Sequence, residues 1–320
     1  MDLKPLYYEM LRIRRVEERI ATLYAEQQMR CPVHLSIGQE AVAAGAAAAL
    51  QGGDQVMSGH RSHAHYLAKG GSLRAMLAEI YGKATGCCGG KGGSMHLVDL
   101  AAGFMGAVPI VGSTIPIAVG LAFGAQLQGT SRVTLAFFGE GATEEGVFHE
   151  SINFASLKKL PVVFVCENNF YSVYSPLAVR QPSHREVFKQ AIGHGVESHQ
   201  ADGNEVADVL RLTGAAVEKA RSGGGPTFIE FQTYRWREHC GPGYDNDIGY
   251  RTPEEYEQWK ARCPLDRTRR QLLATGTGTA ELEAMEARIE LEITEAVAFV
   301  KASPFPPRES AAQPLFAAHS

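Results

Sequence analysis

The sequence predicts an α/β protein whose mostly parallel sheet is covered by helices on both faces, followed by a C-terminal helical extension. Short, continuously apolar runs bounded by turn residues alternate with longer stretches of helical periodicity. This alternation is typical of βαβ units, and unbroken apolar runs are typical of strands buried on both sides. From residue 254 onward the chain becomes charged and helical, and it ends in a proline-rich tail. We therefore expect one domain over 1–260, including the N-terminal helix, and a helical extension with a tail over 261–320.

The first part of the chain is predicted to be helical, with one long loop. Residues 3–28 place apolar side chains such as Leu6, Met10 and Ile13 at helical spacing. Small and apolar residues favour further helices that pack closely. These helices are expected at 38–50, 72–82 and 114–127. The glycine-rich, weakly periodic stretch 83–114 between them is interpreted as a loop.

The middle of the chain is predicted to supply the sheet. The runs RVTLAFF (132–138), VVFVC (162–166) and TFIEFQT (227–233) are short, apolar and rich in β-branched or aromatic residues. Helical stretches at 144–159 and 205–221 lie between them. A strand, a helix and a strand at this spacing form a parallel βαβ crossover.

Composition excludes several classes of function. The chain has 320 residues, 45% hydrophobic and 21% charged, with a net charge of −4. That balance is ordinary for a globular protein and lacks the basic excess of a nucleic-acid-binding surface. The six cysteines form no CxxC pair, so we expect reduced thiols and a cytoplasmic location. The alanine-rich run at 41–50 is too short to span a bilayer, so no membrane association is expected.

A glycine-rich turn follows the first apolar strand. The sequence GEGATEEG at 139–146 opens a helix, whose N-terminus favours an anion, and its glycines allow close backbone approach. The spacing is not the G-x-G-x-x-G of dinucleotide sites. The carboxylate of Glu140 is suited to a phosphate ligand only if a divalent cation lies between them. Magnesium typically binds one or two oxygen ligands from the protein, and phosphate and water oxygens complete its coordination shell.

A second oxygen ligand is expected at the end of the next strand. Ligands of parallel α/β sheets gather beyond the carboxyl ends of the strands. There the chain carries Asn168 and Asn169, 26 residues after the GEG turn. The amide oxygen of an asparagine is a suitable hard ligand, so the two segments together predict a site that holds magnesium diphosphate between two strands.

This pair of segments resembles the thiamine-diphosphate motif, in which GDG is followed at similar spacing by NN. The longer segment 137–176 resembles the alpha subunits of the decarboxylating component of pyruvate, branched-chain 2-oxo-acid and acetoin dehydrogenases, and the resemblance extends over roughly residues 5–305. It implies thiamine diphosphate and Mg²⁺ as cofactors. It also implies the magnesium ligands Glu140, Asn169 and the backbone carbonyl of Tyr171. The turn residues implied to contact the cofactor are Gly139, Glu140, Gly141 and Ala142.

Other segments extend the resemblance. GHRSHAHYLAKGG (59–71) is similar to the segment whose Tyr-Arg pair meets the cofactor, so Arg61 is matched, and His60 stands where tyrosine is common. Pro109 and Val111 match the residues beside the pyrimidine and the bent cofactor, although Pro109 has no N–H to donate. The remaining matched residues are histidines implied to be catalytic near the reacting centre, His63 and His239, of which His239 is also implied to reach the diphosphate.

The resemblance implies an oxidative decarboxylation of a 2-oxo acid, or an acetoin reaction, with acyl transfer to a lipoyl acceptor. The carboxylate that activates the cofactor's pyrimidine belongs to a beta subunit in two-subunit relatives, and no second cofactor half is found in this chain. We therefore expect an α2β2 heterotetramer, inactive as the lone chain, with a lipoyl acyltransferase as partner. Neither nucleic acid nor a membrane is expected as a partner.

Three alternatives stay open at this point. A thiamine-dependent decarboxylase or carboligase without a lipoyl acceptor would keep the same cofactor site. An NAD-dependent dehydrogenase would use Glu167 at the end of the second strand to hold a ribose, although the glycine spacing disfavours it. A non-catalytic scaffold subunit would keep the fold without the cofactor, and the presence of Glu140, Asn169 and Arg61 argues against it.

Overall fold

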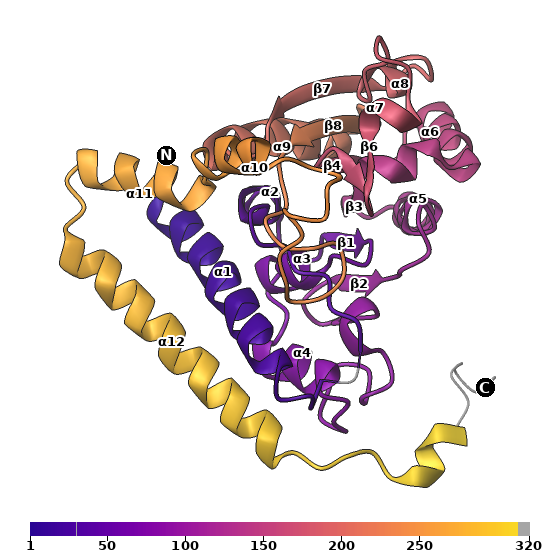
Figure 1. The fold of residues 1–320 in the computed structure, drawn as a ribbon. Coiled ribbons are helices and arrows are strands. Elements are labelled where there is room, and N and C mark those ends of the chain that lie inside the picture. Colours follow the sequence, from indigo (N-terminus) through magenta and orange to yellow (C-terminus); the bar gives the residue numbers. More distant parts are fainter. Residues whose placement is uncertain (30, 313–320) are drawn as a thin grey trace.

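A six-stranded, all-parallel sheet in the order β2-β1-β3-β4-β8-β7 lies at the centre of the computed structural model, which describes residues 1–29 and 31–312 (Figure 1). A short antiparallel pair, β5 and β6, lies apart from it. The strands are β1 (Gln55–Ser58), β2 (Phe104–Ala107), β3 (Thr134–Gly139), β4 (Val162–Asn168), β5 (Tyr171–Ser172), β6 (Ser175–Pro176), β7 (Glu197–Asp202) and β8 (Thr227–Gln232).

Helices cover both faces of the sheet, which confirms the predicted fold class. Successive side chains of a strand point to opposite faces. Leu135 and Phe137 of β3 pack in the larger core cluster with α1 (Lys4–Tyr24). Ala136 and Phe138 pack in the second cluster, on the other side of the sheet. The helices of the larger cluster also include α2 (Glu40–Ala48), α3 (His63–Ala68), α4 (Leu73–Ile80) and α9 (Val206–Arg221), and those of the second include α5 (Thr114–Leu127) and α6 (Gly146–Lys158).

The predicted helix at 114–127 has the bounds of α5, and the other predicted helices differ from the structure by a few residues at their ends. The small-residue helix α2 packs closely, as expected. A Cβ on Gly45 would stand 2.8 Å from the Cβ of Val209 on α9. The remaining short helices are α7 (Leu177–Arg180), α8 (Lys189–Ile192) and the 3₁₀ turns η1 (Gly93–Met95), η2 (Glu140–Glu144) and η3 (Arg308–Ala312).

The sequence did not predict β1, β2 or β7. The strand β2 lies inside the stretch that was interpreted as a loop, and both β1 and β2 have only four residues. The strand β7 (ESHQAD) is an edge strand whose side chains are exposed or half-buried. Because an edge strand needs no continuous apolar run, its hydrophobic pattern gives no strand signal.

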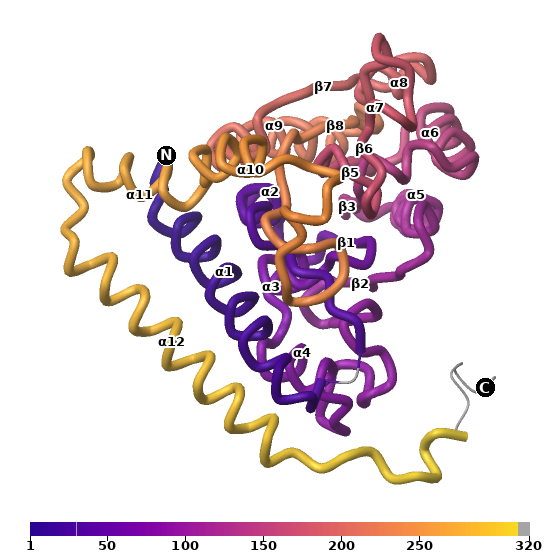
Figure 2. Tube along the Cα trace, in the orientation of Figure 1, coloured from indigo at the N-terminus to yellow at the C-terminus, as the bar shows by residue number. Residues whose placement is uncertain are grey.

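The C-terminal helices are α10 (Pro253–Lys260), α11 (Pro264–Ala274) and α12 (Thr279–Ala302). Figures 1 and 2 show α12, in yellow, running beside α1 along one side of the molecule. Leu282, Ile289 and Ile293 of α12 are buried in the same cluster as the core residues of α1. The division at residue 260 stays a prediction, and the shared core provides a way to test it.

Replacing Ile289 by alanine is expected to lower the free energy of unfolding by about 2–5 kcal/mol, because a fully buried side chain is lost and a cavity remains. If the extension shares the core, calorimetry will show one transition whose midpoint falls as a whole. The control is Leu291→Ala on the same helix, since Leu291 is 60% exposed. Equal effects of the two substitutions, or a shift confined to a separate minor transition, would contradict the shared core.

The carboxyl ends of β1, β3 and β4 lie side by side. After β1 the chain enters α3, which packs in the larger cluster, whereas after β3 it enters α6 on the opposite face. Neighbouring strands whose connections leave to opposite faces form a crevice at their carboxyl ends, where ligands of open α/β sheets bind. The segment between β8 and α10 returns over this edge, with Trp236 N–H donating to the carbonyl of Ile37 (Figure 2). In the described part of the chain, no helix is long and apolar enough to span a bilayer.

Candidate functional site

A pocket of about 270 Å³ lies at the carboxyl ends of β1, β3 and β4. It is lined by most of the residues that the sequence singled out. That volume is slightly below the roughly 300–1,000 Å³ of ligand pockets, which suits a site that takes only part of a ligand. The predicted residues on its lining are His60, Arg61, Pro109, Val111, Gly139, Glu140, Gly141, Ala142, Asn169, Tyr171 and His239.

Glu140 begins η2 directly after β3, so the strand end carries its carboxylate into the pocket. The residue is 1% exposed, and Arg180 Nη2 donates to its Oε1 at 2.5 Å. Burial raises the pKa of this carboxyl, and the nearby Arg180 cation opposes that shift. Arg180 also pairs with Glu144. A cation that binds Glu140 from the pocket side would therefore share or replace the contact with Arg180.

Only the second asparagine of the pair after β4 faces the pocket. Asn168 ends β4, and its amide donates to Glu230 Oε1 at 2.6 Å. Phe170 has a φ of 70°, and this left-handed turn follows Asn169. Asn169 lines the pocket, its amide donates to Gln39 Oε1 at 3.2 Å, and its Oδ1 accepts from the backbone N–H of Tyr171 at 3.2 Å. The oxygen is thus held in place and keeps a lone pair for a ligand.

Arg61 is held on the pocket wall by backbone carbonyls. Its guanidinium donates to Leu35 O at 2.7 Å and to His239 O at 3.2 Å. Burial, with a contribution from Arg235, lowers the pKa of Arg61 to about 10, so it stays a cation at neutral pH. A fixed cation beside a pocket that carries Glu140 and Asn169 suits a phosphate group.

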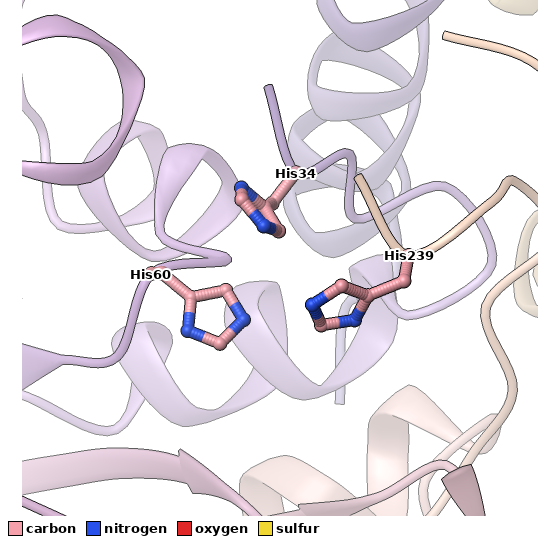
Figure 3. A group of neighbouring side chains, drawn as sticks. All are labelled: His34, His60 and His239. Carbon is pink, nitrogen blue, oxygen red and sulfur yellow. The ribbon is translucent and has the colours of Figure 1, made fainter. Parts of the chain in front are cut away.

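Three histidines from distant parts of the chain meet on this wall (Figure 3). The ring centroids of His34 and His60 are 4.6 Å apart, those of His34 and His239 are 5.1 Å apart, and those of His60 and His239 are 5.5 Å apart. Burial, and then the Arg61 charge, lowers the pKa to about 2 for His34, about 4 for His60 and about 3 for His239. All three imidazoles are therefore neutral at pH 7. His34 is not among the site residues predicted from the sequence.

The structure places His63 behind the pocket rather than on its lining. The ring is fully buried at the start of α3, with Nδ1 2.9 Å from Glu17 Oε1 and Nε2 2.7 Å from Ser94 Oγ. Because both ring nitrogens are engaged by protein groups, His63 is placed to hold the neighbouring loops together. The predicted role of His63 at the reacting centre stays a prediction, and in the structure its ring is buried with both nitrogens engaged.

The structure adds residues that the sequence did not bring forward. His65 lines the pocket, stacks on Phe137 with centroids 4.0 Å apart, and lies 2.8 Å from Ser58 Oγ through Nδ1. Its Nε2 is 3.1 Å from a carboxylate oxygen of Glu167, although the geometry is not that of a hydrogen bond. Its position two residues after His63 on one helix was the only signal in the sequence.

The smaller predicted residues shape the pocket. A Cβ on Gly141 would stand 3.0 Å from Ser172 Oγ, so a side chain there would crowd the turn. Val111 is 47% exposed and offers an apolar surface, and Pro109 lies beside it. The phenol of Tyr171 donates to Glu255 Oε2 at 2.5 Å. The side-chain hydroxyl is therefore already engaged, which is compatible with the prediction that Tyr171 contributes its backbone carbonyl.

These groups fit a magnesium diphosphate. The pocket brings together a buried carboxylate, an oriented amide oxygen, a glycine turn and a fixed guanidinium. The first two are hard oxygen ligands of the kind magnesium takes alongside phosphate and water. The glycines let the backbone approach the anion, and Arg61 offsets the phosphate charge.

Comparisons with known proteins give the family. A family model described as "Dehydrogenase E1 component" matches residues 8–309. The chain is 39% identical, over 94% of its length and 89% of the relative's, to the alpha subunit of acetoin:2,6-dichlorophenolindophenol oxidoreductase of Bacillus subtilis. It is 38% identical, over 97% of its length and 75% of the relative's, to the chloroplastic pyruvate dehydrogenase E1 component subunit alpha-3 of Oryza sativa. The pyruvate dehydrogenase E1 component subunit alpha of Rickettsia felis is 37% identical, over 96% of this chain and 97% of the relative.

The family is that of thiamine-diphosphate-dependent dehydrogenase components, and both pyruvate and acetoin dehydrogenases are among the relatives. These matches do not favour the nicotinamide alternative. The chain therefore belongs to the dehydrogenase E1 component family, among the alpha subunits of 2-oxo-acid dehydrogenases.

Proposed function

We propose that this chain is the α subunit that binds Mg²⁺–thiamine diphosphate for oxidative decarboxylation of a 2-oxo acid, or for the corresponding reaction of acetoin, with acyl transfer to a lipoyl acceptor. The observation that carries the proposal is the meeting of Glu140 and Asn169 at the carboxyl ends of adjacent parallel strands, in one pocket with Arg61. Glu140, Asn169 and the backbone carbonyl of Tyr171 would hold the magnesium. Arg61 and the glycine turn would hold the diphosphate.

Thiamine diphosphate supplies carbanion-stabilising chemistry when bound, and the protein supplies orientation and electrostatics. Pro109 and Val111 would support the apolar part of the cofactor from one side. His239 lines the pocket and its imidazole is neutral at pH 7, so its ring would serve as a hydrogen-bonding group toward the cofactor or substrate. His63 acts at most through its neighbours, because Glu17 and Ser94 engage its ring.

The chain is proposed to work with a beta subunit as α2β2. The exposed sides of α5 and α6 support a large protein interface, since isolated globular surfaces rarely present contiguous apolar patches. The two helices touch through Phe123 and Phe154, whose ring centroids are 5.5 Å apart. The large apolar side chains exposed there are Ile117, Leu127, Phe154 and Leu157. A lipoyl acyltransferase partner and a cytoplasmic location stay predictions.

A cofactor titration with a substrate panel tests the proposal. The co-expressed α and beta subunits are expected to bind thiamine diphosphate only when Mg²⁺ is present, because the carboxylate of Glu140 would otherwise repel the diphosphate. Calorimetric titration with and without Mg²⁺ measures this requirement. Turnover with a dichlorophenolindophenol-type acceptor on pyruvate, branched 2-oxo acids and acetoin then identifies the substrate.

Two results would decide against the proposal. Magnesium-independent binding would contradict the proposed metal ligands. Release of an aldehyde or a coupled product with no reduction of any acceptor would favour the decarboxylase or carboligase alternative instead.

A further inference from the structure

A buried carboxylate in the middle of strand β8, that of Glu230, takes no part in the proposed cofactor contacts. Glu230 interrupts the apolar run TFIEFQT and is 1% exposed. Moving a charged group out of water is costly unless the group is paired or hydrogen-bonded. A strand that needed only burial would carry an apolar residue here, so the carboxylate points to a role that an apolar side chain could not fill.

The parallel sheet brings hydrogen-bond donors to both oxygens of Glu230. Glu230 pairs in register with Cys166 of β4 and with Gln200 of β7. Asn168 lies two residues after Cys166 and therefore on the same face of the sheet. Asn168 Nδ2 donates to Glu230 Oε1 at 2.6 Å. The other oxygen, Oε2, accepts from the backbone N–H of Phe188 at 3.0 Å and from Gln200 Nε2 at 3.1 Å.

The carboxylate determines which way the amide of Asn168 faces. A carboxylate only accepts hydrogen bonds, so the NH₂ group of Asn168 must face Glu230 and its Oδ1 must face the other way. That oxygen accepts from the backbone N–H of Phe170 at 3.0 Å. Phe170 has a φ of 70°, a left-handed conformation that residues with a Cβ rarely adopt. The hydrogen bond from Phe170 to Asn168 therefore supports a turn that the backbone alone would disfavour.

The turn at Phe170 sets the directions of the residues on either side of it, Asn169 and Tyr171. Asn169 Oδ1 accepts from the N–H of Tyr171 at 3.2 Å, so these two residues are coupled across the turn. We propose that Glu230 is a positioning residue for the magnesium ligands. Its carboxylate orients Asn168, whose amide oxygen holds the turn that presents Asn169 and Tyr171. This inference rests on the proposed function, since it assigns Glu230 a role toward the metal proposed there.

The substitution Glu230→Gln tests this role because it keeps the size of the side chain and replaces one acceptor by a donor. The oxygen of the new amide would stay with the two donors, Phe188 and Gln200. Its NH₂ group would then face the NH₂ group of Asn168. Asn168 would have to turn its own NH₂ group toward the N–H of Phe170, and the hydrogen bond that supports the turn would be lost.

Calorimetric titration of thiamine diphosphate into the co-expressed α and beta subunits, over a range of Mg²⁺ concentrations, measures the effect. In Glu230→Gln, the Mg²⁺ concentration for half-maximal binding is expected to rise by about tenfold or more, as is usual when groups that orient metal ligands are changed. At saturating Mg²⁺, kcat should be unchanged, because Glu230 does not line the pocket. The control is Gln200→Ala, which removes one donor to the same carboxylate and keeps the hydrogen bond with Asn168.

Exchanging the two groups separates positioning from packing. In Asn168→Asp alone, two carboxylates would face each other, and the Mg²⁺ requirement should again rise. In the double variant Glu230→Gln/Asn168→Asp, the acceptor at 168 faces the donor at 230 and still accepts from the N–H of Phe170. The Mg²⁺ requirement is therefore expected to return close to that of the wild type, which a loss of packing alone would not allow.

Hydrogen exchange over residues 167–172, measured by mass spectrometry without cofactor, reports on the turn directly. The segment should exchange faster in Glu230→Gln than in the wild type or in the double variant. The inference is overturned if Glu230→Gln keeps wild-type exchange and Mg²⁺ dependence, if Gln200→Ala shifts both equally, or if a double variant with an unchanged circular dichroism spectrum is not restored. Wild-type cofactor binding without Mg²⁺ would instead contradict the proposed function, and this inference with it.

Discussion

Replacing Glu140 by alanine is expected to abolish magnesium-dependent cofactor binding and to lower kcat/KM by roughly 1000-fold or more, because a metal that neutralises phosphate charge contributes several kcal/mol. The carboxylate is buried at the pocket lining, and no other acidic side chain follows β3 as directly. Asn169 alone would leave magnesium with a single protein side-chain ligand. The measurements are a calorimetric titration of thiamine diphosphate at several Mg²⁺ concentrations and steady-state turnover of the α–beta complex.

Two matched variants make this result specific. Glu140→Asp keeps the carboxylate and is expected to retain binding, since the related motif usually carries aspartate there. Glu144→Gln removes the other carboxylate that pairs with Arg180, but Glu144 does not line the pocket. It should bind the cofactor normally. Full activity of Glu140→Ala would contradict the metal assignment. An equal loss in Glu144→Gln would instead attribute the effect to the contacts with Arg180.

The purified lone chain is expected to show no turnover, and addition of its beta subunit should raise the rate by at least about 1000-fold. The pocket supplies groups for the metal and the diphosphate. The pyrimidine-activating carboxylate is predicted to come from the partner, and a positioned acid–base group contributes about 10²–10⁴-fold by itself. Turnover by the chain, by the beta subunit and by the mixture measures the effect, and light scattering reports whether the mixture forms α2β2.

The experiment on the lone chain includes a control for correct folding. It should unfold cooperatively in calorimetry, and its circular dichroism should match the helical content of the structure, so that inactivity is not confused with misfolding. A lone chain that turns over at the rate of the mixture would contradict the division of the active site between two subunits. A mixture that assembles but stays inactive on every 2-oxo acid and on acetoin would point to the scaffold alternative.

Much of the fold and half of the site could be predicted from the sequence because the signals are local. The apolar runs of β3, β4 and β8 are buried on both faces, so hydrophobicity alone marks them. The GEG turn and Asn169 follow directly after two of these strands. Once the strands are parallel neighbours, their carboxyl ends must meet, and the sequence therefore determined that Glu140 and Asn169 share one pocket.

Only the tertiary structure decided which histidines line the pocket. His63 and His65 lie on one short helix, yet His63 is engaged by Glu17 and Ser94 behind the pocket, whereas His65 lines it. Likewise, His34, His60 and His239 are far apart in the sequence. They meet because the segments before α2 and after β8 are hydrogen-bonded across the strand ends. The sequence marks a residue's chemistry and its local element, but the direction of a side chain depends on packing between elements that are distant along the chain.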